Sequence, residues 1–148
     1  MPDSIYRAAR SSKRVLREIF AFPDDYNDWR VKALEYARNL VSQEKIDLIL
    51  STSGPFSSHI VASTLSKETG LPWVADYRDL WSLNHAIFHT SIRKVIERQY
   101  EGCVVKSASA VITVSDPLST VQQELLKKRT VTITNGYDPD DYAVKVDP

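Results

Sequence analysis

The sequence is poor in cysteine, in long apolar runs and in net charge, and each shortage excludes a class of protein. Its single cysteine, Cys103, cannot form an internal disulfide, so a disulfide-stapled secreted domain is excluded. No apolar run approaches the ~18–20 residues that a membrane-spanning helix needs, and the first residues lack the apolar stretch of a signal peptide. The 19 basic and 19 acidic residues cancel, so we expect no nucleic-acid partner.

What the sequence does contain is typical of one globular domain. It has 148 residues, close to the usual size of a single domain, and 43% of them are hydrophobic while 26% are charged. This composition argues against disorder. It predicts a soluble, cytoplasmic protein in which residues 1–148 form a single domain.

Charge is spread unevenly between the two ends of the chain. Residues 1–20 hold five basic and two acidic side chains, whereas residues 135–148 hold one basic and four acidic. Between residues 5 and 20 apolar side chains recur at helical spacing, and a neighbouring face carries Arg7, Arg10, Arg14 and Arg17. This arginine face is either the solvated side of a terminal helix or a contact with an anionic membrane surface or a lipid acceptor.

Short apolar runs alternate with helical patterns along the rest of the chain. The runs at residues 46–52, 72–76, 110–114 and 130–134 predict buried strands. Helices are predicted over residues 29–45, from the 53–58 turn to Gly70, over residues 93–107, and from Ser115 onward. Strands that alternate with helices predict an α/β fold, a Rossmann-like doubly wound parallel sheet flanked by helices.

The same patterns predict three local features. Asn27 or Asp28 suits the N-cap of the first of these helices. Cys103 lies on the apolar stripe of the helix over residues 93–107 and is expected to be an inert part of the core. On the last helix, Val121 and Leu125 are expected to face inward.

Ligands of open α/β sheets bind beyond the carboxyl ends of the strands, and residues 53–58 (SGPFSS) follow the first predicted strand there. They combine a flexible turn, hydroxyl groups and a helix N-terminus, which favours an anionic or hydroxyl-rich ligand. The candidate substrate-binding residues are Ser53, Gly54, Pro55 and Ser57. The alternative is a plain strand-to-helix turn with serine caps, since the segment is neither a P-loop nor a dinucleotide fingerprint.

Residues 76–81 (DYRDLW) form the densest polar cluster of the chain and follow the next predicted strand directly. Carboxylates orient sugar hydroxyls or act as bases, and an arginine pairs with phosphate. Asp76, Arg78 and Asp79 are therefore candidate site residues. The alternative is an Asp–Arg ion pair that only braces the loop, although charge beside a strand end is costly unless it is paired or used.

Two patterns are similar to metal sites, but neither predicts one. Asp138 and Asp140 have the Asp-x-Asp spacing of a manganese motif, yet Pro139 between them favours a plain turn over residues 135–141. His85 and His89 lie four apart, but Ala86 stands where a zinc protease motif needs glutamate, which favours two surface histidines. We expect neither a metal nor a cofactor.

Three segments together carry a family resemblance: residues 72–81 (PWVADYRDLW), 108–115 (ASAVITVS) and 135–138 (NGYD). In this order and spacing they resemble the N-terminal, acceptor-side domain of family 4 glycosyltransferases of the GT-B fold. The first segment looks like the Pro-Trp-Val-x-Asp-x-Arg-Asp-x-Trp signature of a bacterial and archaeal subgroup. Pro23 and Asp24 with Trp29, and residues 47–58, also match, so the resemblance runs from about residue 20 to 142.

The resemblance implies a retaining transfer, usually without a metal, of a sugar from a nucleotide sugar to a glycan or a lipid-linked acceptor. The acceptor binds mainly the first domain and the nucleotide sugar mainly a second one. Arg78 falls where many relatives have a histidine that contacts the transferring sugar, and because arginine is no base at neutral pH its role is expected to be electrostatic. Asp79 corresponds to the neighbouring aspartate. Asn135 and Gly136 follow the last predicted strand at the same carboxyl edge, so they are further candidate substrate-binding residues, and they open the interdomain connection over residues 135–148.

Two departures from the family pattern predict a truncated domain. The family's glycine-rich loop near its first strand has no counterpart, and the second domain with its two glutamates eight apart is missing. We therefore expect no transferase activity from the chain alone, and association of its copies where missing strands would pack. The alternatives are a stand-alone nucleotide-binding or regulatory module, and an interaction domain that docks on a membrane through the arginine face.

Overall fold

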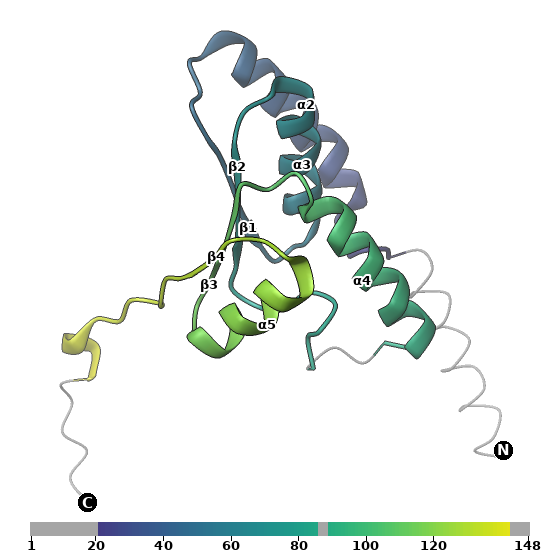
Figure 1. Ribbon diagram of the computed structural model, residues 1–148. Helices are drawn as coiled ribbons and strands as arrows, with labels where there is room; N and C mark the ends of the chain where they lie inside the picture. Colours follow the sequence, from purple (N-terminus) through teal and green to yellow (C-terminus); the bar gives the residue numbers. More distant parts are fainter. Residues whose placement is uncertain (1–20, 86–88, 143–148) are drawn as a thin grey trace, which may run out of the picture.

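A computed structural model describes residues 21–85 and 89–142 of the chain (Figure 1). The helix predicted between residues 5 and 20, with its arginine face, lies outside the described residues. The described part contains four strands, four α-helices and a short 3-10 helix, η1 (Pro139–Tyr142).

The four strands form one parallel sheet in the order β1-β2-β3-β4. They are β1 (Ile49–Ser53), β2 (Trp73–Tyr77), β3 (Ala110–Thr113) and β4 (Thr130–Thr132). The register aligns Ser51 with Ala75, Ala75 with Val111 and Val111 with Thr130. All four predicted strands are present, so the prediction of a Rossmann-like α/β fold with a parallel sheet is confirmed.

Helices connect the strands and pack on one face of the sheet. These helices are α3 (Ser57–Thr69), α4 (Ser91–Val105) and α5 (Asp116–Leu126), and α2 (Asn27–Gln43) packs against α3. Because right-handed crossovers that always advance in one direction leave every helix on the same side, the strand order explains the single helix layer. Figure 1 shows α3 and α4 on the same side of the strands. A reversal of strand order, which makes a sheet doubly wound, does not occur among the four described strands.

The core lies between this helix layer and the sheet. Trp73, Ala75 and Val111 point into it from alternate strand positions and are fully buried. The next positions along the strands point to the opposite face, where Leu50 and Val131 are exposed. Parallel sheets are normally covered on both faces, so this apolar surface is unusual for the fold.

Helix ends follow the predicted chemistry in some places and not in others. Gly70 takes the left-handed conformation with φ of 75° at the end of α3, as predicted, and α5 begins at Asp116 with proline in its first turn. The prediction that Asn27 or Asp28 caps α2 is wrong, because Tyr26 occupies the N-cap position. The Asn27 amide instead donates to the Phe22 carbonyl at 3.1 Å.

Helix α5 buries a different residue from the one predicted. Val121 is exposed, so the prediction that it faces inward is wrong, and the neighbouring Gln122 is fully buried instead. Leu125 is half-buried, so the same prediction is partly correct for this residue. The hydroxyl of Ser119 lies 2.7 Å from that of Thr132, which orients the helix on β4. The helix rotation is therefore set by polar contacts as well as by its apolar residues.

Helix α4 turns charged residues inward and leaves the apolar residues of its first half exposed, while its last turn buries Val104 and Val105 in the core. Arg93, Glu97 and Glu101 are the buried charged residues. Cys103 is also exposed, so its predicted place in the core is wrong. The physical reason is that the inward side chains find specific polar partners, which compensate their desolvation. Arg93, for example, donates to Glu97 at 2.7 Å from Nε.

Candidate functional site at the carboxyl edge of the sheet

Three candidate residues from two separate segments are joined at the carboxyl ends of the strands. Arg78 follows β2, and its Nε donates to Asp76 Oδ2 at 3.0 Å. Its Nη1 donates to Asn135 Oδ1, from the segment that follows β4, 57 positions away in the sequence. The two bonds hold the guanidinium across the edge of the sheet. Parallel strands direct their carboxyl ends to the same edge, which is why these segments meet.

The residues joined by these hydrogen bonds differ in their exposure to solvent. The Asp76 side chain is 8% exposed and the Arg78 side chain 43%. Asp76 Oδ1 is buried without a hydrogen-bond partner among the described residues, so one oxygen of this carboxylate retains its accepting capacity. Asp79 and Gly136 lie at the exposed surface beside it. The Arg78 guanidinium and the exposed Asp79 are therefore open to solvent, while Asp76 lies beneath them.

The turn after β1 lies close to the loop after β2. The Phe56 ring stacks on Trp81 with centroids 4.9 Å apart. Ser53 is buried and its Oγ has no partner among the described residues, whereas Gly54 is exposed and Pro55 half-buried. The two predicted site segments, residues 53–58 and 76–81, are thus in direct contact.

The N-terminus of α3 is occupied by a carboxylate from the chain itself. The Ser57 backbone N–H donates to Asp24 Oδ2 at 2.8 Å, and its Oγ donates to Asp24 Oδ1 at 2.6 Å. Ser57 is fully buried by this contact. An anion at a helix N-terminus satisfies unpaired amides and complements the helix dipole, so the anion-binding property predicted for this turn is used internally.

A buried carboxyl lies beneath the loop that carries Arg78 and Asp79. Glu101 of α4 is fully buried, and its Oε2 accepts from the Ser82 backbone N–H at 3.1 Å. Burial raises the pKa of Glu101, and burial together with the nearby Glu101 raises the pKa of Tyr77 well above its ordinary value. Sequence reasoning missed Glu101, because its position on a helix predicted no particular partner.

Comparison with known protein families identifies the family of this chain. A sequence model of the family described as Glycosyltransferase Family 4 matches residues 3–141, which is nearly the entire chain. The chain belongs to this family. No curated protein matches it. The fold agrees with the family resemblance inferred from residues 72–81, 108–115 and 135–138, since these segments form β2 and its loop, β3, and the connection after β4.

His59 of this glycosyltransferase chain is fully buried, and its sequence position did not indicate a special role. His59 Nδ1 lies 2.8 Å from Ser51 Oγ, which accepts from Trp73 Nε1 at 2.8 Å. The His59 ring also packs against Tyr77, with centroids 4.7 Å apart. Desolvation by burial lowers the pKa of His59 to about 3, so the ring is neutral at physiological pH. Its place in the first turn of α3 makes it a core residue behind β1.

The histidines and aspartates whose spacing is similar to metal sites make other contacts in this glycosyltransferase chain. His85 is exposed as predicted, but His89 is half-buried and its Nδ1 lies 3.0 Å from Glu97 Oε2. The Asp140 backbone N–H donates to Asp138 Oδ1 at 3.0 Å, a bond typical of a turn. Across residues 21–85 and 89–142, no group of three or more potential metal-ligating side chains comes together.

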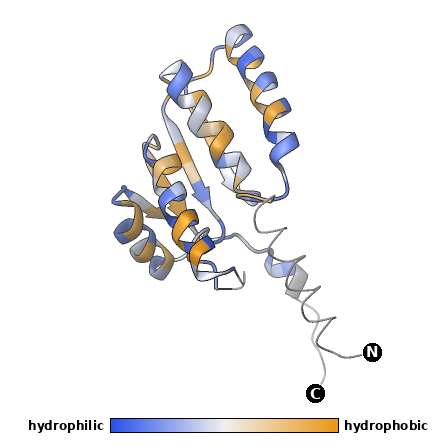
Figure 2. Cartoon of the chain, turned by 90° about the vertical axis from the view of Figure 1, so that its right-hand side faces the viewer, coloured by the Kyte–Doolittle hydropathy of each residue, from blue (hydrophilic) through white to orange (hydrophobic). Residues whose placement is uncertain are grey.

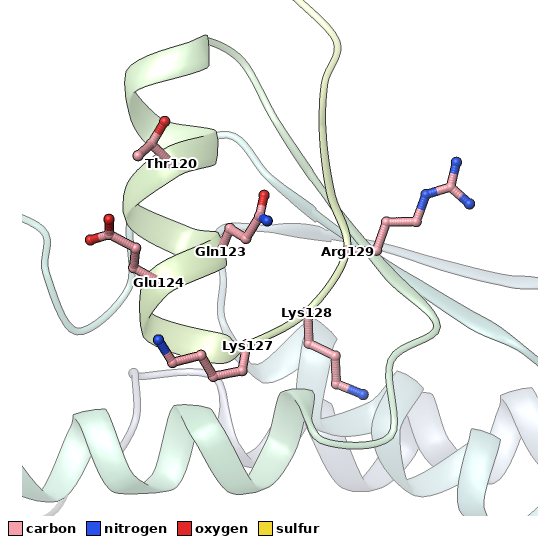
Figure 3. A pocket seen from close by; sticks show the side chains of 6 residues that line it. All are labelled: Thr120, Gln123, Glu124, Lys127, Lys128 and Arg129. Carbon is pink, nitrogen blue, oxygen red and sulfur yellow. The ribbon is translucent and has the colours of Figure 1, made fainter.

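A cavity of about 630 Å³ lies away from this edge (Figure 3). Its lining is Thr120, Gln123, Glu124, Lys127, Lys128 and Arg129. It lies at the end of α5 and before β4, so it is near the amino edge of the sheet and contains none of the predicted site residues. Lys128 is committed to structure there, because its Nζ donates to the carbonyls of Lys106 at 2.6 Å and Ala108 at 2.9 Å.

Among the helices of the described ranges, none combines the length and the apolar character needed to cross a bilayer.

Proposed function

We propose that this chain is the acceptor-side domain of a retaining glycosyltransferase, which moves a sugar from a nucleotide sugar to a glycan or a lipid-linked acceptor. The observation that carries the proposal is the contact of Arg78 with both Asp76 and Asn135 at the carboxyl edge of the sheet. Ligands of open α/β sheets bind at this edge. Membership of the glycosyltransferase family supports sugar transfer as the chemistry.

Arg78 supplies a fixed positive charge in this proposal. A guanidinium stays protonated at neutral pH, so it stabilises negative charge on the leaving phosphate and does not transfer a proton. Its bonds to Asp76 and Asn135 orient it before a substrate binds. Asp79, which is exposed beside Arg78, accepts hydrogen bonds from sugar hydroxyls, and the buried Asp76 holds the guanidinium in place.

The turn after β1 completes the acceptor site. In this proposal Ser53, Gly54 and Pro55 contact the acceptor from the turn after β1, and Asn135 with Gly136 contacts it from the segment after β4. Ser57 binds the acceptor only by exchange. Its N–H and Oγ already donate to Asp24, so an acceptor group at the N-terminus of α3 would have to replace the Asp24 carboxylate. We therefore expect ligands at this turn to be anionic or rich in hydroxyl groups.

The nucleotide sugar binds a second domain in this proposal, and the chain alone needs no cofactor and has no transferase activity. Its place of action is the cytoplasm, with the face of Arg7, Arg10, Arg14 and Arg17 directed to the inner surface of the membrane. Isothermal titration calorimetry of the chain with nucleotide sugars and free nucleotides tests whether the nucleotide site lies on this domain or on a second one. We expect no binding, and micromolar affinity for any nucleotide would instead favour a stand-alone nucleotide-binding module.

The role of Arg78 is tested in a parent enzyme that includes a donor domain. Replacement of one preorganised electrostatic group costs about 10²–10³ in turnover, so Arg78→Ala is expected to lower kcat by that factor. Arg129→Ala is the matched control, because Arg129 is also exposed but lies at the other edge of the sheet. Urea unfolding of both variants checks that the fold is intact. A wild-type kcat for Arg78→Ala would refute the assignment.

A further inference from the structure

The loop after β2 has an exposed part and a buried part. Arg78 and Asp79 are exposed at the carboxyl edge of the sheet, whereas Trp81 and Ser82 are buried. Only Leu80 separates Asp79 from Trp81 in the sequence. The placement of the buried part therefore limits where the exposed side chains can lie, because consecutive Cα atoms are about 3.8 Å apart.

One hydrogen bond joins the backbone of this loop to the helix layer. Figure 2 views this layer and shows hydrophilic residues, in blue, between hydrophobic ones, in orange, along its helices. The Ser82 N–H donates to Oε2 of Glu101, in the second half of α4, at 3.1 Å. Within residues 21–85 and 89–142, it is the only hydrogen bond that joins the backbone of residues 79–83 to another element.

Aromatic contacts also hold the buried part of the loop, but they do not fix the direction of its backbone. The Trp81 ring stacks on Phe56 with centroids 4.9 Å apart, and its edge-on contact with Tyr100 of α4 has centroids 6.0 Å apart. Hydrophobic burial is non-directional, whereas a hydrogen bond depends on the angle at its donor. The bond from Ser82 to Glu101 is therefore the contact that orients the loop backbone on α4.

Glu101 occupies a position where a carboxyl group is costly. Its side chain is fully buried, and its Oε1 has no hydrogen-bond partner among the described residues. The polar side chains close to it are the buried, uncharged Tyr77 of β2 and Gln122 of α5, and no ion pair within the described ranges includes it. An apolar side chain of similar size would avoid this desolvation cost. What the carboxyl group supplies instead is an acceptor for the Ser82 N–H.

We propose that Glu101 is a positioning residue, which holds the loop through the Ser82 N–H so that Arg78 and Asp79 face the substrates. This inference rests on the proposed function, in which these two side chains act on the substrates. A buried hydrogen bond is electrostatically stronger than one in water, so this single bond can define the path of the loop. A displacement of about 1 Å at a reacting group costs about 100-fold in turnover.

The alternative is that Glu101 contributes only to overall stability. In that case its loss would loosen the loop and the core of the sheet together. It would lower the apparent kcat through the fraction of unfolded enzyme and leave every KM unchanged. The two experiments that follow separate these outcomes.

Amide hydrogen exchange of the full chain, followed by mass spectrometry, measures the hold on the loop directly. Glu101→Leu removes the acceptor at similar volume, and we expect exchange at residues 78–83 to be about 10-fold faster, with no change at β3. Glu101→Gln is the matched control, because its amide oxygen still accepts from Ser82, and its loop should exchange as in the unsubstituted chain. Equal loop exchange in all three chains, fast exchange in Glu101→Gln, or an equal rise at β3 would each overturn the proposal.

Kinetics of a parent enzyme with a donor domain provide the second measurement. Glu101→Leu is expected to lower kcat about 10–100-fold and to raise the KM for the acceptor, and Glu101→Gln should restore both. The KM for the nucleotide sugar should stay unchanged, because that substrate binds the second domain in the proposed function. A wild-type kcat for Arg78→Ala would refute the proposed function and leave the exchange result as the test of the loop. Loss of activity in Arg78→Ala without loss in Glu101→Leu would refute the positioning role alone.

Discussion

Acid should destabilise this domain through one buried imidazole. His59 is fully buried, and burial lowers its pKa from 6.5 to about 3. In the unfolded chain the ring has its ordinary pKa, so below pH 6.5 the unfolded state binds a proton that the folded state does not. The part of the stability that depends on the neutral His59 ring is therefore fully present above pH 6.5 and is lost as the pH falls toward 3.

The size of the effect follows from the two pKa values. Each pH unit between them costs roughly 1.4 kcal/mol, and because the unfolded ring is only partly protonated at pH 6–7, the loss from pH 7 to pH 5 is about 2 kcal/mol. Urea unfolding followed by tryptophan fluorescence at pH 7 and pH 5 measures it directly. His59→Gln removes the titrating group, so the difference between the two pH values should shrink by about 2 kcal/mol.

The control is His85→Gln, since His85 is exposed and its substitution should leave the pH dependence unchanged. The comparison uses the change with pH and not the absolute stability, because His59→Gln also loses packing against Tyr77. Should His59→Gln and the unsubstituted chain lose the same free energy between pH 7 and pH 5, the reasoning from burial would be refuted.

Three further predictions concern the polar contacts that hold the helices. Arg93→Ala leaves Glu97 buried without its cation and should lower the free energy of unfolding by about 3–5 kcal/mol in urea titrations; a loss below 1 kcal/mol would contradict it. Asp24→Ala removes the cap at Ser57 and should cost about 1–2 kcal/mol, with a reduced helical signal in circular dichroism. Glu101 has a raised pKa, so the folded state holds its proton more tightly than the unfolded state, and stability falls as the pH rises above 4.5. Glu101→Gln should abolish that fall while its amide oxygen still accepts from the loop, and an unchanged pH profile would count against the assignment.

The sheet and the location of the site could be predicted because they depend on local patterns. Four short apolar runs alternate with helical ones, and parallel strands bring their carboxyl ends to one edge, so Asp76, Arg78 and Asn135 were expected near each other. The individual bond between Arg78 and Asn135 could not be predicted, since it joins loops 57 positions apart. Whether these residues bind substrate stays a prediction.

The orientation of the helices could not be predicted from the same patterns. On α4 the apolar stripe suggested an inward face, but Arg93 reaches carbonyls 72 and 70 positions earlier, and its burial leaves the apolar residues of the first half of the helix exposed. The contact of Asp24 with Ser57 spans 33 positions and likewise has no local signal. Side chains whose partners lie far away in the sequence override the periodicity of the helix that carries them.

The order of the strands has a consequence for how the domain is synthesised. Each strand pairs with the one that precedes it in the chain, so β1, α3 and β2 form a complete unit before β3 leaves the ribosome. Among the four described strands, none has to insert between two that are already paired. The sheet can therefore grow in one direction at the speed of translation, and at every stage the newest strand is the open edge that the next one joins.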